Sequence, residues 1–273
     1  MNETKYPWVS ELDHKPCCEL KPKIKIKNLS LAYGKRSIFE NINLEINTGC
    51  VTGIIGPSAC GKSSFISCLN RMIEVVPSAT VTGDILIDEK NIFDSRLDLN
   101  ELRKKVGIVF QEPTPLPFSI ESNIILPLKE HKFNHIHERM EKCLRDVGLW
   151  NEVKNNLKGP ANDLSGGQKQ RLCMARTIAL EPEIILMDEP CSSLDPISTD
   201  VVEKLIHELK GKYTIIIITH NLAQARRVCD FVATFWYDGV KEIGLIIESG
   251  RCVDIFEHPK NKIVQEYVGG LKG

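Results

Sequence analysis

A glycine-rich segment near residue 60 has the composition of a loop that binds phosphate groups. Residues 56–63 read GPSACGKS. They match the pattern GxxxxGK[ST], in which backbone N–H groups at the start of a helix surround phosphate oxygens. Lys62 would then reach the β- and γ-phosphates of a nucleotide, and the Ser63 hydroxyl would ligate Mg2+. The segment predicts a phosphate-binding loop (P-loop), and the alternative is a plain glycine turn.

The whole loop and the first turn of the following helix would hold the nucleotide. The residues concerned are Gly56, Pro57, Ser58, Ala59, Cys60, Gly61, Lys62, Ser63 and Ser64. Cys60 lies inside the loop, beside Lys62 and the start of a helix, and both features lower the pKa of a thiol. We therefore expect Cys60 to be a thiolate that alkylates readily.

Two adjacent carboxylates follow an apolar segment in the second half of the chain. Residues 184–190 read IILMDEP, and ligands of open α/β sheets bind where parallel strands end. Asp188 suits the Mg2+ shell, as in other P-loop nucleotidases. Glu189 would act as the general base toward the attacking water. An isolated pair of this kind would be read as a solvated strand end, but here we favour the chemical interpretation.

A second glycine-rich segment precedes a run with helical spacing. Residues 163–171 read DLSGGQKQR and lead into LCMARTIAL. Ser165 would be the N-cap, and Gly166 and Gly167 leave backbone N–H groups at the helix start open to an anion. A glycine-rich helix cap is the alternative. The sequence LSGGQ is, however, the signature of the ABC ATPases, and on this motif the chain resembles that family.

The resemblance to ABC ATPases covers further motifs in the family's order, from Lys23 to about Ser249. It implies that the signature binds nucleotide through Ser165, Gly166, Gly167 and Gln168. Gln111, after VGIVF, matches the glutamine that contacts Mg2+ and the water and faces the permease; otherwise it is a solvated glutamine. His220, after TIIIIT, matches the histidine that contacts the γ-phosphate, although a lone histidine at a strand end is more often a surface residue.

Two other positions take their interpretation from the same resemblance. Asp195, in SSLDP, matches the loop that passes between two subunits, although SLDP alone indicates only a turn and a helix N-cap. Tyr33, in LSLAYG, matches the aromatic residue that stacks on adenine, although such a tyrosine is usually a packing residue. The implied catalytic residues are Glu189, His220 and Gln111, and the implied metal ligands are Ser63, Gln111 and Asp188.

ABC ATPases work in pairs, and the resemblance implies the same for this chain. Two copies would form a head-to-tail homodimer that buries two ATP molecules. Each nucleotide would lie between Lys62 of one copy and the turn at Ser165 to Gly167 of the other. Because the γ-phosphate bridges both halves, ATP would favour closure and hydrolysis would favour opening. Permease subunits in the membrane would follow that motion.

Longer stretches resemble the ATPase subunit of the phosphate-specific ABC importer. They are LNRMIEVVPSATVTGDI, VFQEPTPLPFSI, RLCMARTIALEPEIILMDEPCSSLDPIST, THNLAQARRVCDF and IFEHPKN. This implies an ATP hydrolase that drives import of inorganic phosphate through two integral-membrane permease subunits, with a phosphate-binding protein as an indirect partner. The chain would lie at the cytoplasmic face of the membrane.

Three rival functions remain to be compared with this interpretation. An ABC importer ATPase for another solute would share the same nucleotide motifs. A soluble ABC ATPase of DNA repair or translation typically carries long coiled-coil insertions or a second cassette, and neither is present in this sequence. A P-loop kinase or another nucleotide-dependent enzyme would explain Lys62 and Asp188 but would leave LSGGQ and His220 without a purpose.

The chain departs from the family pattern at three places. Ala59 stands where the family's phosphate loop usually has glycine, which would constrain the loop slightly. Glu112 follows Gln111 where the family commonly has lysine, and this inverts a charge near the permease contact. The segment FWYDGVKEIGLIIESG, residues 235–250, is a few residues longer than the family's corresponding hairpin.

The elements that would position these residues alternate between strand and helix. KIKIKNLSLAY and IFENINLEI alternate apolar and polar residues, as antiparallel strands do. Residues 62–71 have helical spacing, and long segments separate the short apolar strands, as a buried parallel sheet requires. The expected strands are CVTGII at 50–55 and the runs at 106–110, 184–187 and 214–218.

The predicted fold is α/β: a RecA-like P-loop NTPase with a parallel sheet core, an N-terminal antiparallel β subdomain and an inserted helical subdomain, as in ABC ATPases. The proline-rich EPTPLPFS cannot be helical, but helical spacing follows around 121–129 and 136–147. We expect a polar leader at 1–22, an ATPase domain at 23–250 with its helical subdomain at about 112–170, and a C-terminal tail at 251–273.

The composition agrees with a globular protein and excludes some partners. The 273 residues are 42% hydrophobic and 26% charged, and a net charge of -1 gives no field that would attract nucleic acid. No apolar run approaches the roughly 20 residues of a membrane-spanning helix, and the N-terminus has no apolar h-region. We expect a cytoplasmic chain whose ten cysteines are reduced rather than disulfide-bonded or metal-bound.

Overall fold

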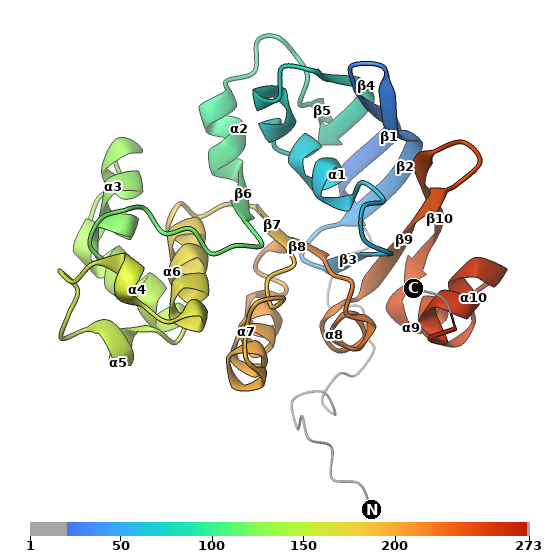
Figure 1. The fold of residues 1–273 in the computed structure, drawn as a ribbon. Coiled ribbons are helices and arrows are strands. Elements are labelled where there is room, and N and C mark those ends of the chain that lie inside the picture. Colours follow the sequence, from blue (N-terminus) through green and yellow to red (C-terminus); the bar gives the residue numbers. More distant parts are fainter. Residues whose placement is uncertain (1–20, 272–273) are drawn as a thin grey trace, which may run out of the picture.

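The computed structural model describes residues 21–271, and within them one twisted sheet is covered by helices on both faces (Figure 1). The sheet has ten strands in the order β5-β4-β1-β2-β10-β9-β3-β8-β7-β6. The strands are β1 Pro22–Tyr33, β2 Arg36–Asn47, β3 Val51–Ile55, β4 Ala79–Ile87, β5 Lys90–Asn91, β6 Val106–Val109, β7 Ile184–Asp188, β8 Thr214–Ile218, β9 Phe231–Asp238 and β10 Ile243–Arg251.

The helices are distributed between and after these strands. They are α1 Lys62–Cys68, η2 Met72–Val75, α2 Leu99–Lys105, α3 Ser122–Glu130, α4 Ile136–Asp146, α5 Trp150–Val153, η3 Ala161–Asp163, α6 Gly166–Ala179, α7 Pro196–Leu209, α8 Leu222–Val228, α9 Cys252–Glu257 and α10 Lys262–Val268. No helix within residues 21–271 is long and apolar enough to span a membrane.

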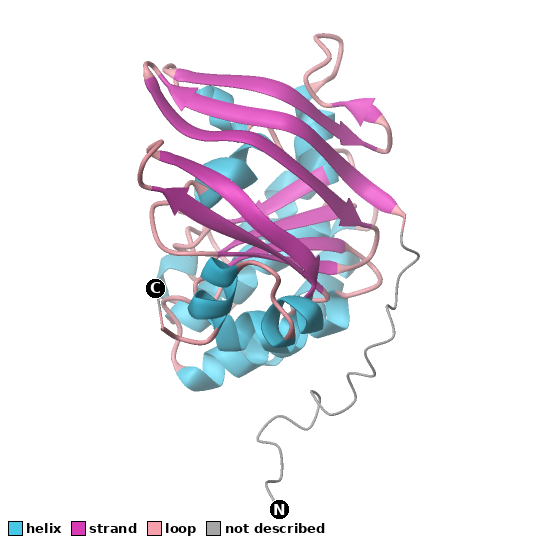
Figure 2. Cartoon of the chain, turned by 90° about the vertical axis from the view of Figure 1, so that its right-hand side faces the viewer, coloured by secondary structure: helices cyan, strands magenta, loops and turns pink. Residues whose placement is uncertain are grey.

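One half of the sheet is antiparallel. β1 pairs with β2 on one side and with β4 on the other, and the buried side chains of β2 alternate with exposed ones, as predicted. The hairpin β9 and β10 joins this half to the rest, because β10 contacts β2 through the pair Gly244 and Phe39 while β9 pairs in parallel with β3. Figure 2 shows the long strands twisting across the molecule with most helices beneath them.

The other half is parallel and buried on both faces. Along β7, Ile184 and Leu186 belong to one apolar cluster, whereas Ile185 and Met187 belong to another on the opposite face. The same alternation runs along β8. Uninterrupted apolar runs such as IILM therefore reflect strands that have helices on both sides. The predicted α/β fold with a parallel core is confirmed.

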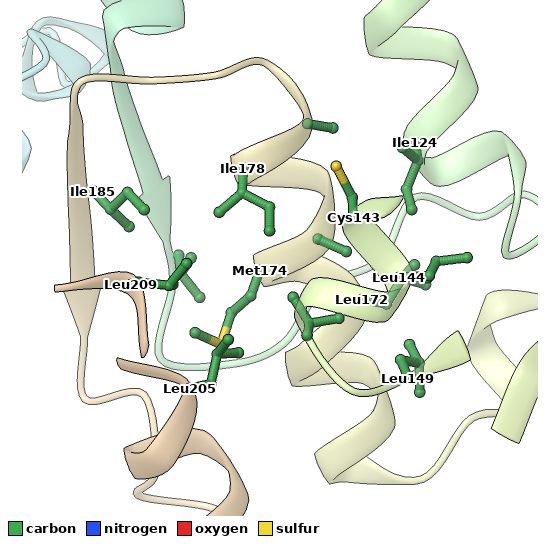
Figure 3. Packing of buried hydrophobic residues seen from close by; sticks show 14 of the residues in the cluster. Ile124, Cys143, Leu144, Leu149, Leu172, Met174, Ile178, Ile185, Leu205 and Leu209 are labelled. Atoms are coloured by element: carbon green, nitrogen blue, oxygen red, sulfur yellow. The ribbon is translucent and has the colours of Figure 1, made fainter. Parts of the chain in front are cut away.

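Helices occupy the chain between β6 and β7. The longest of them, α6, packs on both sides: Figure 3 shows Leu172 close to Leu144 of α4, whereas Met174 points toward Leu205 of α7. All four side chains are buried in one cluster with Ile185 of the sheet. Helix α6 therefore connects the neighbouring helices to the sheet.

The structure corrects two details of the sequence analysis and adds to a third. The helix after the phosphate loop ends at Cys68 rather than near Arg71, because Arg71 has a left-handed φ of 58° and begins a short 3-10 helix. Seven described cysteines are free thiols, but Cys50 is disulfide-bonded, so the expectation of reduced cysteines is wrong there. The segment after Gly250, predicted only as a tail, begins with α9 and α10. The leader lies outside the described residues except for Lys21 and Pro22.

A buried ion pair joins α7 to α8. The carboxylate of Glu203 is fully buried and accepts hydrogen bonds of 2.7 Å from both Nε and Nη2 of Arg227. Removing one partner of such a pair leaves an uncompensated charge in the core. We predict that Arg227→Met lowers the free energy of unfolding by about 3–5 kcal/mol in urea titrations at pH 7.

The neighbouring exposed residue Arg226 provides the control for this prediction. Arg226→Met should cost less than about 1 kcal/mol, since it loses only a cation-π contact with Phe256. The double variant Glu203→Leu/Arg227→Met should recover most of the loss. A single Arg227→Met variant as stable as the control would show that the pair contributes little.

Candidate nucleotide site

Four adjacent parallel strands deliver the predicted site residues to one edge of the sheet. In the order β3, β8, β7 and β6, each strand ends directly before or at one of them. The phosphate loop follows β3, His220 follows β8, Asp188 ends β7 with Glu189 next, and Gln111 follows β6. Because carboxyl ends of parallel strands meet at one edge, residues distant in sequence converge there.

The glycines of the phosphate loop occupy positions that no other residue fits. Gly56 has a φ of 146°, and a Cβ atom on it would lie 2.1 Å from the carbonyl oxygen of Phe235. Gly61 has a φ of 100° and would contact Ile38. Ala59 also has a positive φ, 62°, a backbone conformation that favours glycine. A left-handed alanine costs about 1–2 kcal/mol, so the substitution strains the loop without blocking it.

Lys62 lies folded into its own loop. Its side chain is buried, and Nζ donates hydrogen bonds to the carbonyl oxygens of Gly56 at 3.0 Å and Pro57 at 2.6 Å. These two carbonyls hold the ammonium group against the backbone at the start of the loop. A phosphate group that enters the loop would compete with these carbonyls for the N–H donors of Nζ.

Cys60 is not the reactive thiolate that the sequence analysis expects. Its side chain is only 1% exposed. Burial raises the pKa of the thiol, and this outweighs the opposing effect of Lys62, whose Nζ lies 3.7 Å from Sγ. The prediction was wrong because sequence shows the neighbouring charge and helix but not the depth of burial.

Asp188 and Ser63, the predicted metal ligands, lie close together beside the loop. Burial raises the pKa of Asp188, the nearby Glu189 raises it further, and a hydrogen bond from the Ser63 side chain opposes the rise. The Oδ1 atom of Asp188 is buried and has no hydrogen-bond partner among the described residues. A carboxylate oxygen and a hydroxyl are the hard ligands that Mg2+ prefers. These residues therefore fit a magnesium ion.

Glu189 lies between the two other residues predicted to be catalytic. Its Oε1 is 2.9 Å from Nδ1 of His220, and its Oε2 accepts a hydrogen bond of 3.3 Å from Nε2 of Gln111. Glu189 has a left-handed φ of 45°, and its N–H donates to the carbonyl of Ile218 on β8. Strained backbone at a residue held from several sides is typical of functional positions. A carboxylate held in this way can accept a proton from water.

The signature segment begins α6 with a complete capping box. Ser165 accepts a hydrogen bond from the backbone N–H of Gln168, whose side chain accepts one from the N–H of Ser165. Gly167 is packed so closely that a Cβ atom would lie 2.6 Å from Oγ of Ser198, whereas Gly166 faces open space. The predicted N-cap role of Ser165 is confirmed, and within the signature Ser165 and Gly166 are exposed whereas Gly167 is buried.

Asp195 and Tyr33 have local partners in this chain. Asp195 caps α7 by accepting hydrogen bonds from the N–H groups of Ile197 and Ser198, and the Ser198 hydroxyl lowers its pKa. The half-buried Tyr33 hydrogen-bonds Oγ of Ser64 at 3.2 Å, which places it beside the helix that follows the phosphate loop. The contacts of both residues with a nucleotide or a second subunit stay predictions.

The sequence analysis missed a cavity next to Glu189. A space of about 270 Å3 lies between α7, α8 and the loop after β7, and Glu189 and His220 form part of its wall. Thr199 and the buried Gln224 line it as well. Neither residue belongs to a recognisable motif, so only the fold reveals their position.

Comparison with known proteins defines the class of this fold and site. The family model described as ABC transporter matches residues 39–192. The solved structure of cbiO1 from Clostridium perfringens, part of the ABC transporter complex cbiONQ, superposes with a TM-score of 0.73 and 27% identity over 87% of this chain and 91% of that one. A bacterial Atm1-family ABC exporter with ATP bound shares the fold at a TM-score of 0.74, covering 92% of this chain and 42% of that one.

Sequence relatives narrow the class further. Phosphate import ATP-binding protein PstB 1 of Nitrosococcus oceani is 47% identical over 94% of both chains. Phosphate import ATP-binding protein PstB of Corynebacterium glutamicum is 48% identical over 92% of this chain and 99% of its own. The chain belongs to the ABC transporter family, within the group of ATP-binding proteins that these relatives represent.

The half-buried carboxylate of Asp188 leads to a prediction about stability and pH. Because its pKa in the folded state is raised, the charged form costs stability above that pKa, and the cost disappears as the pH falls and Asp188 takes up a proton. We predict that Asp188→Asn raises the melting temperature of the nucleotide-free protein at pH 7 to 8. This gain in melting temperature should shrink toward pH 4 to 5. For a chain of this size, each 1 kcal/mol of stability corresponds to about 2–4 °C in melting temperature.

Asp195→Asn is the matched control, since the pKa of the exposed Asp195 is lowered rather than raised. Its carboxylate stabilises the fold above that pKa, so this variant should not raise the melting temperature at any pH tested. Thermal melts that show the same shift for both variants would contradict the assignment of strain to Asp188.

Proposed function

We propose that this chain is the ATP-hydrolysing subunit of an ABC importer for inorganic phosphate. The observation that carries the catalytic part is the position of Glu189, held by Gln111 and His220 one strand end away from Asp188 and the phosphate loop. The phosphate substrate is supported by relatives near 47% identity whose names state phosphate import. The residue roles given below belong to this proposal.

The phosphate loop binds the triphosphate of ATP through its backbone N–H groups. Lys62 leaves the carbonyls of Gly56 and Pro57 and turns toward the β- and γ-phosphates, so that a charge held by neutral dipoles gains an anionic partner. Tyr33 lies where an adenine ring can stack against it. Ser63 and Asp188 hold Mg2+, which supplies charge neutralisation at the phosphates when bound.

Hydrolysis requires a water placed between Glu189 and the γ-phosphorus. Glu189 takes a proton from this water, and the water oxygen forms a bond to the γ-phosphorus. The bond between the γ-phosphorus and the β-γ bridging oxygen breaks, which gives ADP and inorganic phosphate. Gln111 and His220 fix the orientation of the Glu189 carboxylate, so that its lone pair is directed toward the position of this water. Positioning and electrostatics provide most of the rate in phosphoryl transfer.

A second copy of the chain completes each nucleotide site. Helix α1 packs in the cluster on one face of the sheet and α6 packs in the cluster on the other. The signature on α6 therefore serves the phosphate loop of a partner rather than its own, in a head-to-tail pair. Ser165 and Gly166 are exposed at this helix start, where the N–H of Gly166 and the helix dipole would face the γ-phosphate, whereas the N–H of Ser165 donates to Gln168. Asp195 lies beside them at the start of α7.

Permease subunits bind near the segment that follows Gln111. Three large apolar side chains are exposed around it: Phe110 is 46% exposed, Phe118 52% and Leu126 on α3 41%. Asn123, which is fully buried, holds the proline-rich loop through three hydrogen bonds to the backbone of Leu116 and Ser119. A rigid loop with exposed aromatic residues suits the end of a membrane protein's helix.

In this proposal the chain is held at the membrane by its partners. Two permease subunits would bind one ATPase pair at the cytoplasmic face, and a phosphate-binding protein would deliver the solute on the other side. The exposed carboxylate of Glu112 stands at the proposed contact, where the family commonly has lysine. The permease surface that contacts Glu112 would therefore be positively charged, whereas a surface that contacts lysine would be negatively charged.

The assignment of Glu189 predicts that Glu189→Gln binds ATP but hydrolyses it about 10² to 10⁴ times more slowly, because the amide keeps the shape and removes the base. Closed pairs should then accumulate. Size-exclusion chromatography with Mg-ATP should show a dimer for the variant, which returns to monomer when ATP is removed.

Glu257→Gln, an exposed substitution on α9, provides the control and should behave as the wild type. Asp188→Asn should give a weaker dimer, since it disturbs the ligands that position the phosphates. A Glu189→Gln variant that turns over at the wild-type rate, or stays monomeric with saturating Mg-ATP, would refute the role of general base.

The exposed aromatic residue Phe118 tests the permease surface and the solute together. We predict that Phe118→Ser leaves the ATPase rate of the isolated chain within about twofold but lowers ATP-driven uptake of radioactive phosphate into vesicles with the permeases at least tenfold. Glu112→Lys should also alter uptake more than basal ATPase activity.

Val240→Ser is the matched control, because Val240 is 95% exposed on the hairpin at the other end of the molecule (Figure 1). Its uptake should equal that of the wild type. Equal loss of uptake and ATPase activity in Phe118→Ser would indicate a structural role. Wild-type vesicles that import sulfate rather than phosphate would overturn the proposed solute.

A further inference from the structure

Helix α5 carries a carboxylate that contacts the signature at the start of α6. Oε2 of Glu152 accepts hydrogen bonds from Nε2 of Gln168 at 2.9 Å and from Nη2 of Arg171 at 3.1 Å. Its Oε1 accepts a third from Nη1 of Arg171 at 2.7 Å. Gln168 is the last residue of LSGGQ, whereas Glu152 lies 16 residues before it and belongs to none of the motifs found in the sequence.

Arg171 fixes the position of this carboxylate. Its guanidinium donates one hydrogen bond to each oxygen of Glu152, a bidentate geometry that is stronger than a single contact. Nη1 also donates to the carbonyl of Gly148 at 2.9 Å, between α4 and α5. Burial raises the pKa of Glu152, but the hydrogen bonds from Arg171 and Gln168 outweigh this effect and lower it. The carboxylate is therefore charged at neutral pH and can only accept hydrogen bonds.

The charge of Glu152 determines which way the amide of Gln168 points. A glutamine amide has an oxygen that accepts hydrogen bonds and a nitrogen that donates them. Because Glu152 only accepts, the nitrogen faces it, and the oxygen is left to accept the backbone N–H of Ser165 at 2.9 Å. With the amide reversed, oxygen would face oxygen at Glu152, and two donors would meet at Ser165. The capping box therefore depends on Glu152 for the orientation of one of its side chains.

The capping box in turn orders the residue that would contact a partner's nucleotide. Oγ of Ser165 accepts from the backbone N–H of Gln168 at 3.3 Å, so its own O–H can be donated to an anion. Ser165 is exposed, and in the proposed pair it would face the γ-phosphate bound by the other copy. A helix start that is already ordered loses less conformational entropy when this contact forms.

We infer that Glu152 is a positioning residue that orders the signature for the partner's nucleotide by fixing the amide of Gln168. The inference rests on the proposal that two copies pair through ATP and the signature. Loss of the ordered contact should weaken each signature's hold by the factor that one hydrogen bond supports, about 3- to 10-fold. A twofold pair contains two signatures, so the dissociation constant of the pair should rise by about 10- to 100-fold.

The test is made in the full-length Glu189→Gln chain, which is expected to accumulate closed pairs with Mg-ATP. Glu152→Ala is added to it, and Glu141→Ala is the matched control. Glu141 is 41% exposed and Glu152 40%, so neither truncation leaves a cavity in the core. Oε1 of Glu141 also accepts two hydrogen bonds from an arginine, Arg145, but both residues lie on α4 and do not bridge to α6.

Two quantities are measured for each variant. Analytical ultracentrifugation with Mg-ATP gives the dissociation constant of the pair. Fluorescence titration of the dilute, monomeric chain gives Kd for a fluorescent ATP analogue. Glu152→Ala should raise the dissociation constant of the pair about 10- to 100-fold but leave Kd for the analogue within twofold, because the phosphate loop is unchanged. Glu141→Ala should change neither quantity more than twofold.

A third substitution, Gln168→Met, shows whether Glu152 acts through the amide. It should weaken pairing by a similar factor, and Glu152→Ala added to it should have no further effect, since both changes break the same contact. The inference is overturned if Glu152→Ala pairs as tightly as Glu141→Ala, or if its effect is equally large in the presence of Gln168→Met. A Glu189→Gln chain that stays monomeric with saturating Mg-ATP would instead refute the proposed function.

Discussion

The site depends on the parallel pairing of β3, β8, β7 and β6. Each of these strands is buried on both faces, so its ends are fixed by helices above and below the sheet. A shift of one residue in any strand would exchange its side chains between the two apolar clusters, each of which is packed around the present set. The same shift would carry Asp188 or the phosphate loop away from the shared edge. Packing that excludes water from the core therefore sets the geometry of the chemistry.

The nucleotide-free site holds several groups in unfavourable states. Asp188 is a half-buried carboxylate beside Glu189, Ala59 and Glu189 have left-handed backbones, and the hydrogen bonds of Lys62 go to two carbonyls and a thiol. Strain of this kind persists only where the surrounding structure enforces it. Binding of a polyanion with a divalent cation would give these charged groups partners of opposite charge. Part of the binding free energy would therefore come from relieving the unfavourable states of the free site.

Local patterns in the sequence predicted most of the fold and much of the site. Strand alternation, the run IIII of β8 and the glycines at Gly56 and Gly61 all act through nearby residues, so a single sequence displays them. Burial depth does not follow from neighbours along the chain, and this is why the expectation for Cys60 was wrong. The packing of Tyr267 was missed for the same reason, because it joins a buried cluster with Ile55 of β3 only when the last helix packs against the core.

The close packing of Gly167 against Ser198 has a consequence for how two copies would move. Gly167 belongs to the signature on α6 and Ser198 to the first turn of α7, which Asp195 caps. With no room between them, these two helix starts shift together, and α6 and α7 share a buried contact further along. The signature at the start of α6 would contact the nucleotide bound by the partner, and the start of α7 would contact the partner itself. These two segments thus form one rigid edge. In a pair with twofold symmetry, loss of the signature's contact with one nucleotide would move this edge and weaken the contacts at the other nucleotide. The two sites would then be expected to open together.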